Sequence, residues 1–102
     1  MFTYKFTQDA RADLLNIRKY TLKTWGKEQS AKYLHELNKT LQLLSDSPSI
    51  GIQRTDISLT TFSFPYASHI IYYTLDSDFL IVFAVLHKNM VPEKHITNRK
   101  QQ

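Results

Sequence analysis

The chain has 102 residues, which is room for one domain with one hydrophobic core, and we expect residues 1–102 to form a single domain. It contains no cysteine, so disulfide bonds, thiolate metal ligands and cysteine nucleophiles are excluded. The formal net charge of +4 favours an acidic partner, either nucleic acid or an acidic protein segment, without choosing between them.

The first half of the chain predicts one strand followed by two helices. Residues 2–7 alternate, with three aromatic side chains on one face, which is typical of a short strand. Apolar residues then recur at helical spacing up to about Thr24, and Gly26 is a natural end for that helix. A second helical pattern ends before Pro48. Because the turn between the helices is so short, we expect an antiparallel helical hairpin.

The second half predicts three strands, at Thr60–Phe64, His69–Leu75 and Phe79–Leu86. The last two are apolar on both faces and are joined by a short turn, so they should pair antiparallel in the middle of a sheet. Tyr72 and Tyr73 point to opposite faces, one toward the helices and the other toward an open face. The predicted fold is α+β, in the order β-α-α-β-β-β, with the helical hairpin packed on a mainly antiparallel sheet.

Residues 88–102 predict a basic C-terminal tail that belongs to no regular element. Pro92 interrupts the pattern, and Glu93 is the only acidic residue there. The cations of this tail are Lys88, Lys94, Arg99 and Lys100. Together with the cations of the first helix, they would form one positive surface, although a charged face is commonly just solvated.

Four segments, spread over nearly the whole chain, carry a family pattern. In order, they are Ala12-Asp13-Leu14 with Ile17 and Tyr20; Trp25–Leu34; Ser47–Ile57 followed by Phe64–Tyr73; and Val85–Met90. In this order and spacing they resemble the ParE toxins of bacterial type II toxin–antitoxin systems, in the RelE/ParE superfamily. One departure is Val91-Pro92 after the methionine, where the family often has aspartate followed by a basic residue. This departure concerns the geometry of the tail.

The resemblance implies a function as well as a fold. A ParE-like toxin would inhibit DNA gyrase, through its A subunit, by binding and not by catalysis. A cognate ParD-like antitoxin would neutralise it through the antitoxin's C-terminal segment, and the pair would serve plasmid maintenance. No cofactor or metal is expected. The oligomeric state stays open between a homodimer and a larger toxin–antitoxin hetero-oligomer.

The location of the protein is also an expectation from sequence. The chain shows no export signal, and its longest apolar run is the length of a strand and not of a membrane span. We therefore expect a cytoplasmic protein without a membrane partner.

Nine residues are candidates for binding the antitoxin or the target. They are Arg18, Lys23, Trp25, Arg54, His87, Lys88, Met90, Lys94 and Arg99. Arg54 has an equally good structural interpretation, in which it pins its loop by pairing with Asp56 or a backbone carbonyl. We expect Trp25 to pack over the helix turn as part of the core; if exposed, it would instead be an interface anchor.

The enzyme alternative is a ribosome-dependent mRNA interferase of the RelE kind, because RelE and ParE toxins share a fold. RNA cleavage by side chains needs a base, an acid and a cation for the phosphate. RelE-like toxins place arginine, lysine and tyrosine on the open sheet face and near the chain end, and here that arginine is missing. His69, His87 and Lys88 would form an acid–base set only if they converge, with Asn89 and His95 nearby. A degenerate toxin that retains only antitoxin binding is the third alternative.

Overall fold

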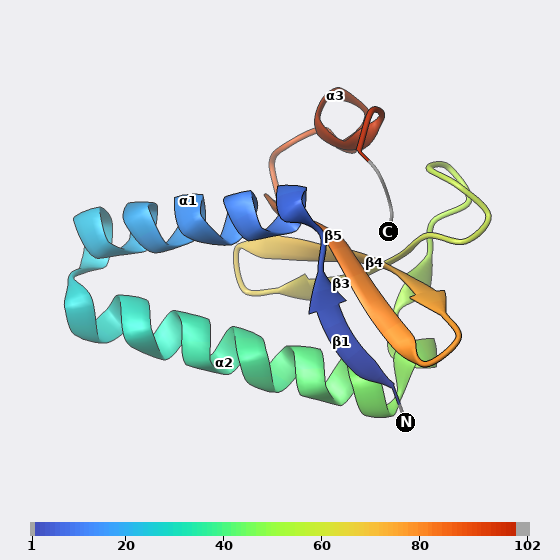
Figure 1. Ribbon diagram of the computed structural model, residues 1–102. Helices are drawn as coiled ribbons and strands as arrows, with labels where there is room; N and C mark the ends of the chain where they lie inside the picture. The colour runs from blue at the N-terminus through green and yellow to red at the C-terminus, as the bar shows by residue number, and fades with distance from the viewer. Residues whose placement is uncertain (1, 100–102) are drawn as a thin grey trace.

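The computed structural model describes residues 2–99, so Lys100, counted above among the tail cations, lies outside the described residues. The elements in chain order are β1 (Thr3–Phe6), α1 (Gln8–Trp25), α2 (Lys27–Asp46), the 3-10 helix η1 (Pro48–Ile50), β2 (Ile52–Gln53), β3 (Phe62–Tyr66), β4 (His69–Asp76), β5 (Phe79–His87) and α3 (Pro92–Ile96). The α+β fold and the order of the long elements are as predicted (Figure 1). Among the described helices, none is long and apolar enough to cross a membrane.

Local sequence explains where the two long helices begin and end. The Thr7 hydroxyl caps α1 by accepting a hydrogen bond from the backbone N–H of Ala10. Gly26 separates α1 from α2 with a φ of 90°, a conformation that glycine adopts without strain. Near this turn the hydroxyls of Thr21 and Ser30 lie 2.7 Å apart in the interior and join the two helices. The predicted helical hairpin is confirmed.

One five-stranded sheet has the order β1-β5-β4-β3-β2. The strands β2, β3, β4 and β5 pair antiparallel, whereas β1 pairs parallel with β5. The parallel pair arises because the α1–α2 hairpin and the later strands intervene between β1 and β5 in the chain. The two-residue strand β2 was not predicted. The central strands β4 and β5 are buried along most of their length, as expected for strands covered on both faces.

The strand β3 begins and ends two residues later than predicted and includes Pro65. Proline is tolerated here because β2 pairs only with Phe62 and Ser63, which leaves the outer edge of β3 open at Pro65. The expectation that Pro65 ends the strand was therefore wrong.

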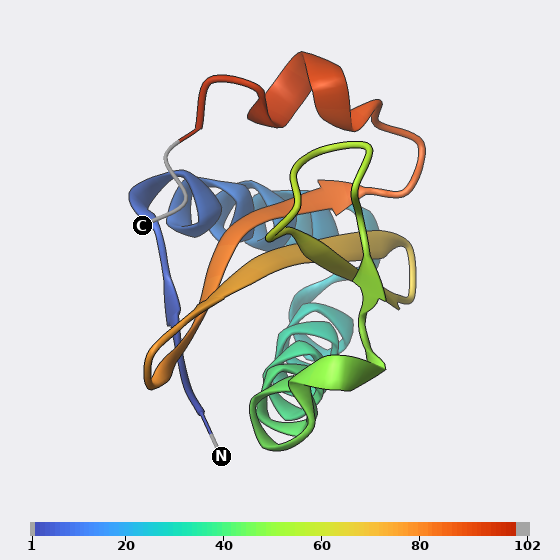
Figure 2. The ribbon, with the colours of Figure 1, turned by 90° about the vertical axis from the view of Figure 1, so that its right-hand side faces the viewer.

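Two hydrophobic clusters lie on the two faces of the sheet. Tyr73 belongs to the cluster beneath α1 and α2, and Tyr72 belongs to a second cluster with Phe83, Leu86 and Ile96. The opposite orientation of the two tyrosines is confirmed. The face of Tyr72, however, is not open, because the loop between β2 and β3 and the helix α3 lie next to each other and contribute to this cluster (Figure 2).

The basic tail is more ordered than predicted. Pro92 begins the short helix α3 and does not simply break the pattern. Proline suits the first turn of a helix because its fixed φ is helical and its missing N–H would have no partner there. Ile96, at the end of α3, is 4% exposed and anchors the helix on the second cluster.

Candidate functional site

The nine candidate residues do not converge on one pocket. Arg18 and Lys23 lie along α1, Trp25 ends that helix, and Arg54 lies in the loop after β2. The other five lie between His87, the last residue of β5, and Arg99. The candidate residues therefore lie on several surfaces of the molecule.

Arg99 is held by a carboxylate of the first helix. Its guanidinium donates to both oxygens of Asp13 at 2.6 and 3.0 Å, and to the backbone carbonyl of Phe83 at 3.2 Å. The N–H of Val85 donates to the same carboxylate at 2.9 Å. The pair with Asp13 raises the pKa of Arg99 above its usual value. Arg99 thus fastens the C-terminal segment to the body of the protein.

The position of Asp13 in the sequence indicates that its carboxylate needs a partner. Asp13 stands three residues after Ala10 and four before Ile17, so it shares the inner face of α1 with two buried residues. A carboxylate in such a position needs a cation or several hydrogen-bond donors. Sequence spacing alone does not identify Arg99 as the partner.

The other candidate cations of the C-terminal segment, Lys88 and Lys94, are exposed. Met90 is half-buried against the second cluster, and His87 is half-buried at the end of β5. This segment therefore combines side chains that fix it on the sheet with lysines that face solvent.

Arg54 pins its loop as the structural interpretation predicted. It donates to the two carboxylate oxygens of Asp56 at 3.0 and 2.9 Å, and it reaches the Ser63 hydroxyl at 3.4 Å. Its guanidinium also lies over the ring of Tyr72, 5.6 Å from the ring centre. The hydrogen bonds from Arg54 hold the pKa of Asp56 below its usual value. A contact of Arg54 with a partner stays a prediction.

Trp25 is 44% exposed, so the expectation that it is part of the core was wrong. The reason is the length of the helical hairpin, whose tip projects past the edge of the sheet so that no second layer covers it (Figure 1). The ring of Trp25 instead contacts Tyr20 and Tyr33, with ring centres 6.3 and 5.5 Å away.

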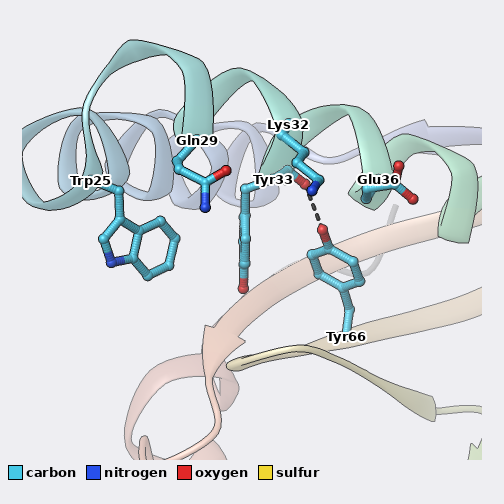
Figure 3. Close-up of a pocket in the computed structure, with 6 residues that line it drawn as sticks. All are labelled: Trp25, Gln29, Lys32, Tyr33, Glu36 and Tyr66. Carbon is cyan, nitrogen blue, oxygen red and sulfur yellow. Dashed lines mark hydrogen bonds between the residues drawn. The ribbon is translucent and has the colours of Figure 1, made fainter.

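A groove of about 440 Å³ lies between α2 and β3 beside Trp25. Figure 3 shows its lining: Trp25, Gln29, Lys32, Tyr33, Glu36 and Tyr66. The Tyr66 hydroxyl donates to the backbone carbonyl of Tyr33 at 2.6 Å, and their ring centres are 5.0 Å apart. Burial raises the pKa of Tyr66 to about 12, so the phenol stays protonated as a donor. We call Tyr20, Trp25, Tyr33 and Tyr66 the aromatic row.

A second groove, of about 470 Å³, lies between α1 and α2 on the side of β1, and we call it the aliphatic groove. Its lining is mostly apolar: Phe6, Arg11, Leu14, Leu15, Arg18, Leu34, Leu37, Asn38 and Leu41. Arg11 and Arg18 are two helical turns apart on α1, and both are exposed. This groove offers an apolar floor with positive charge at its rim.

The histidines of the enzyme alternative do meet. His69 and His87 are paired across β4 and β5, with ring centres 5.6 Å apart, and Lys88 follows directly in the chain. His69 Nδ1 lies 2.6 Å from the Tyr33 hydroxyl. Burial lowers the pKa of His69, and the nearby His87 lowers it further. Within residues 2–99, no cluster of three or more metal-ligating side chains occurs.

Comparison with known proteins gives the family. The family model described as the ParE toxin of the type II toxin–antitoxin system parDE matches residues 4–92. The chain belongs to the ParE toxin family. The resemblance carried by the four segments is thus confirmed, and the chain is a ParE-type toxin of a type II toxin–antitoxin system.

Two relatives agree with this assignment. Toxin ParE1 of Caulobacter vibrioides is 29% identical over 96 residues, covering 94% of this chain and 99% of that protein. A solved structure titled "Chromosomal ParDE TA system from P. aeruginosa" matches with a TM-score of 0.73 at 16% identity. The match covers 85% of this ParE-family chain and 96% of that chain. At this identity the structural match supports the fold alone.

Proposed function

We propose that this ParE-family toxin acts by binding DNA gyrase, through the A subunit, and has no catalytic activity of its own. The position of the C-terminal segment is the observation that supports the absence of catalytic activity. RelE-like toxins use an open sheet face for catalysis, whereas here Ile96 and the Arg99–Asp13 pair fix α3 against that face. Family membership supports gyrase as the target, and a cytoplasmic location would follow from that target.

A ParD-like antitoxin would neutralise the toxin by laying an amphipathic helix of its C-terminal segment into the aliphatic groove. The leucine floor fits the apolar side of such a helix, and Arg11 and Arg18 fit acidic residues along its edge. A groove of this kind left uncovered favours self-association, so the free toxin should form homodimers or aggregates that the antitoxin converts into a defined hetero-oligomer.

The RelE-like alternative has one observation in its favour, namely that His69 and His87 lie side by side. Two features weigh against it. His69 Nδ1 is engaged by Tyr33, and Arg54 already has its carboxylate partner in Asp56. In the histidine set considered above, Lys88 would have to supply the cation that stabilises the phosphate.

Parallel assays distinguish these functions. Purified toxin is added to gyrase with relaxed plasmid, and separately to ribosomes translating a defined mRNA, each with and without cognate antitoxin. Loss of supercoiling that antitoxin reverses supports the proposal. Codon-position cuts in the mRNA would establish the RelE-like activity instead. If neither occurs while antitoxin still binds, the chain is a degenerate toxin that retains only antitoxin binding.

A further inference from the structure

The two sides of the helical hairpin differ in chemistry. The aliphatic groove on the β1 side is built from leucines with arginines at its rim. The groove on the β3 side is walled by aromatic rings, with Lys32 and Gln29 among its polar residues. An amphipathic peptide helix fits the aliphatic groove, because the leucine side chains of the groove can interdigitate with aliphatic side chains of the peptide. The second groove offers mainly flat ring surfaces and needs a different partner.

The aromatic row is held in place by hydrogen bonds that leave ring surfaces available. The Tyr66 hydroxyl is fixed on the carbonyl of Tyr33, and the Tyr33 hydroxyl lies 2.6 Å from His69 Nδ1. Successive ring centres are 6.3, 5.5 and 5.0 Å apart from Tyr20 to Tyr66. At the outer end Tyr20 is 57% exposed, and Trp25 is 44% exposed. Large exposed rings on rigid supports are suited to stacking on flat ligands.

Positive charge predominates near the aromatic row. Residues 19–32 contain four cations and the single carboxylate of Glu28; the cations are Lys19, Lys23, Lys27 and Lys32. All four are exposed, and in the described part of the chain none of them forms a salt bridge. The groove itself also contains the carboxylate of Glu36, which lies 3.9 Å from the ammonium group of Lys39. Lys32 lines the groove, and Lys23 and Lys27 lie within two residues of Trp25. Unpaired lysines beside exposed rings are the combination that binds single-stranded nucleic acid, whose bases stack while its phosphates contact cations.

We propose that the aromatic row and the lysines around it bind single-stranded nucleic acid. Bases would stack on Trp25 and along the tyrosine rings, Lys32 would contact a phosphate, and the Gln29 amide would be within reach of base edges. Double-stranded DNA fits less well because its bases are already stacked on one another. The proposal goes beyond gyrase binding and does not depend on it. If gyrase is the target, the same surface would hold a strand exposed in the gyrase–DNA complex.

Trp25 makes the test direct, because it is the only tryptophan of the chain. Its fluorescence is followed while a twelve-nucleotide oligothymidine is added to the full-length protein at low salt, with the matching duplex as comparison. We expect saturable quenching by the single strand, weaker binding by the duplex, and affinity that falls steeply with salt. The Lys32→Glu variant should bind about fivefold more weakly. The control Lys5→Glu makes the same charge change on β1 and should bind like the parent.

A pair of variants at Tyr66 isolates the contribution of stacking. Tyr66→Leu should weaken binding by about tenfold, while Tyr66→Phe, which keeps the ring, should retain most of it. Circular dichroism confirms that each variant is folded. Equal weakening by both Tyr66 variants would overturn the proposal, and so would the absence of quenching by oligothymidine. It would also be overturned if heparin and an acidic peptide of the same charge displaced the bound oligothymidine equally well. The last of these results would identify a general polyanion surface in its place.

Discussion

Arg99 and Asp13, separated by 86 positions in the sequence, form a bidentate salt bridge that closes the C-terminal segment against the first helix. The side chains are only 17% and 11% exposed, and the same carboxylate also accepts the N–H of Val85. One interaction therefore connects α1, β5 and the end of the described chain. The described part of the predicted basic tail, residues 88–99, therefore belongs to the folded domain.

Removing this salt bridge should destabilise the protein. Arg99→Ala leaves the Asp13 carboxylate largely buried with one backbone donor, and we expect a loss of about 2–3 kcal/mol in the free energy of unfolding. Urea denaturation measures the change. The exposed Lys94→Ala is the control and should change stability by less than about 0.5 kcal/mol. Equal stability of Arg99→Ala and the parent would mean that the segment is not held as described.

Stability should fall at mildly acidic pH because of His69. Burial and the neighbouring His87 hold the pKa of folded His69 below its usual 6.5, so the unfolded chain binds the proton more readily. The contribution is present above pH 6.5 and is lost as the pH falls toward the lowered folded value. Urea midpoints at pH 7.5 and 5.0 measure it. His69→Gln should show a smaller drop, and the exposed His95→Gln should behave like the parent. Identical drops in all three proteins would contradict this assignment.

Gly51 lies against a buried tyrosine and should not tolerate a side chain. A Cβ atom there would overlap the hydroxyl end of Tyr73, which donates to the carbonyl of Pro48 at 2.6 Å. We expect Gly51→Ala to destabilise the protein by about 2 kcal/mol, because Tyr73 is fully buried and cannot move aside. Thermal unfolding measures it, with the exposed neighbouring substitution Ser49→Ala as control. A stability within experimental error of the parent would show that this loop shifts freely.

Charge reversal along the first helix should separate the two sides of the hairpin. Arg18 lines the aliphatic groove, whereas Lys23 lies near Trp25 and does not line that groove. We expect Arg18→Glu to weaken binding of the antitoxin's C-terminal peptide by roughly tenfold and Lys23→Glu to weaken it by much less. Isothermal titration calorimetry with the purified peptide measures both. Equal effects of the two variants would count against the aliphatic groove as the antitoxin site.

The fold was predictable where it depends on local pattern. Helical spacing and Gly26 define the hairpin, and the apolar runs of β4 and β5 predict buried central strands. The second layer was missed, because α3 is only five residues long and its main anchor, Ile96, is a single apolar residue in a polar segment. A short element of that kind gives too few positions for a periodic signal.

The candidate binding surfaces were less predictable than the fold. Trp25 was expected in the core because large aromatic residues are commonly buried, but the projection of the hairpin tip past the sheet leaves it exposed. Conversely, Arg99 was expected at a surface, and the fold brings it to Asp13. The exposure of Trp25 and the pairing of Arg99 both depend on how the elements are placed in space, which sequence periodicity does not predict.

The stoichiometry of gyrase inhibition tests the proposed binding function most directly. Supercoiling by a fixed amount of gyrase is measured as toxin is added in steps, at two incubation times, with the antitoxin complex as control. A toxin that acts by binding should inhibit in proportion to its amount until gyrase is saturated, with the same titration curve at both times. Full supercoiling in the presence of excess toxin, or inhibition by far less toxin than gyrase that grows with time, would contradict the account.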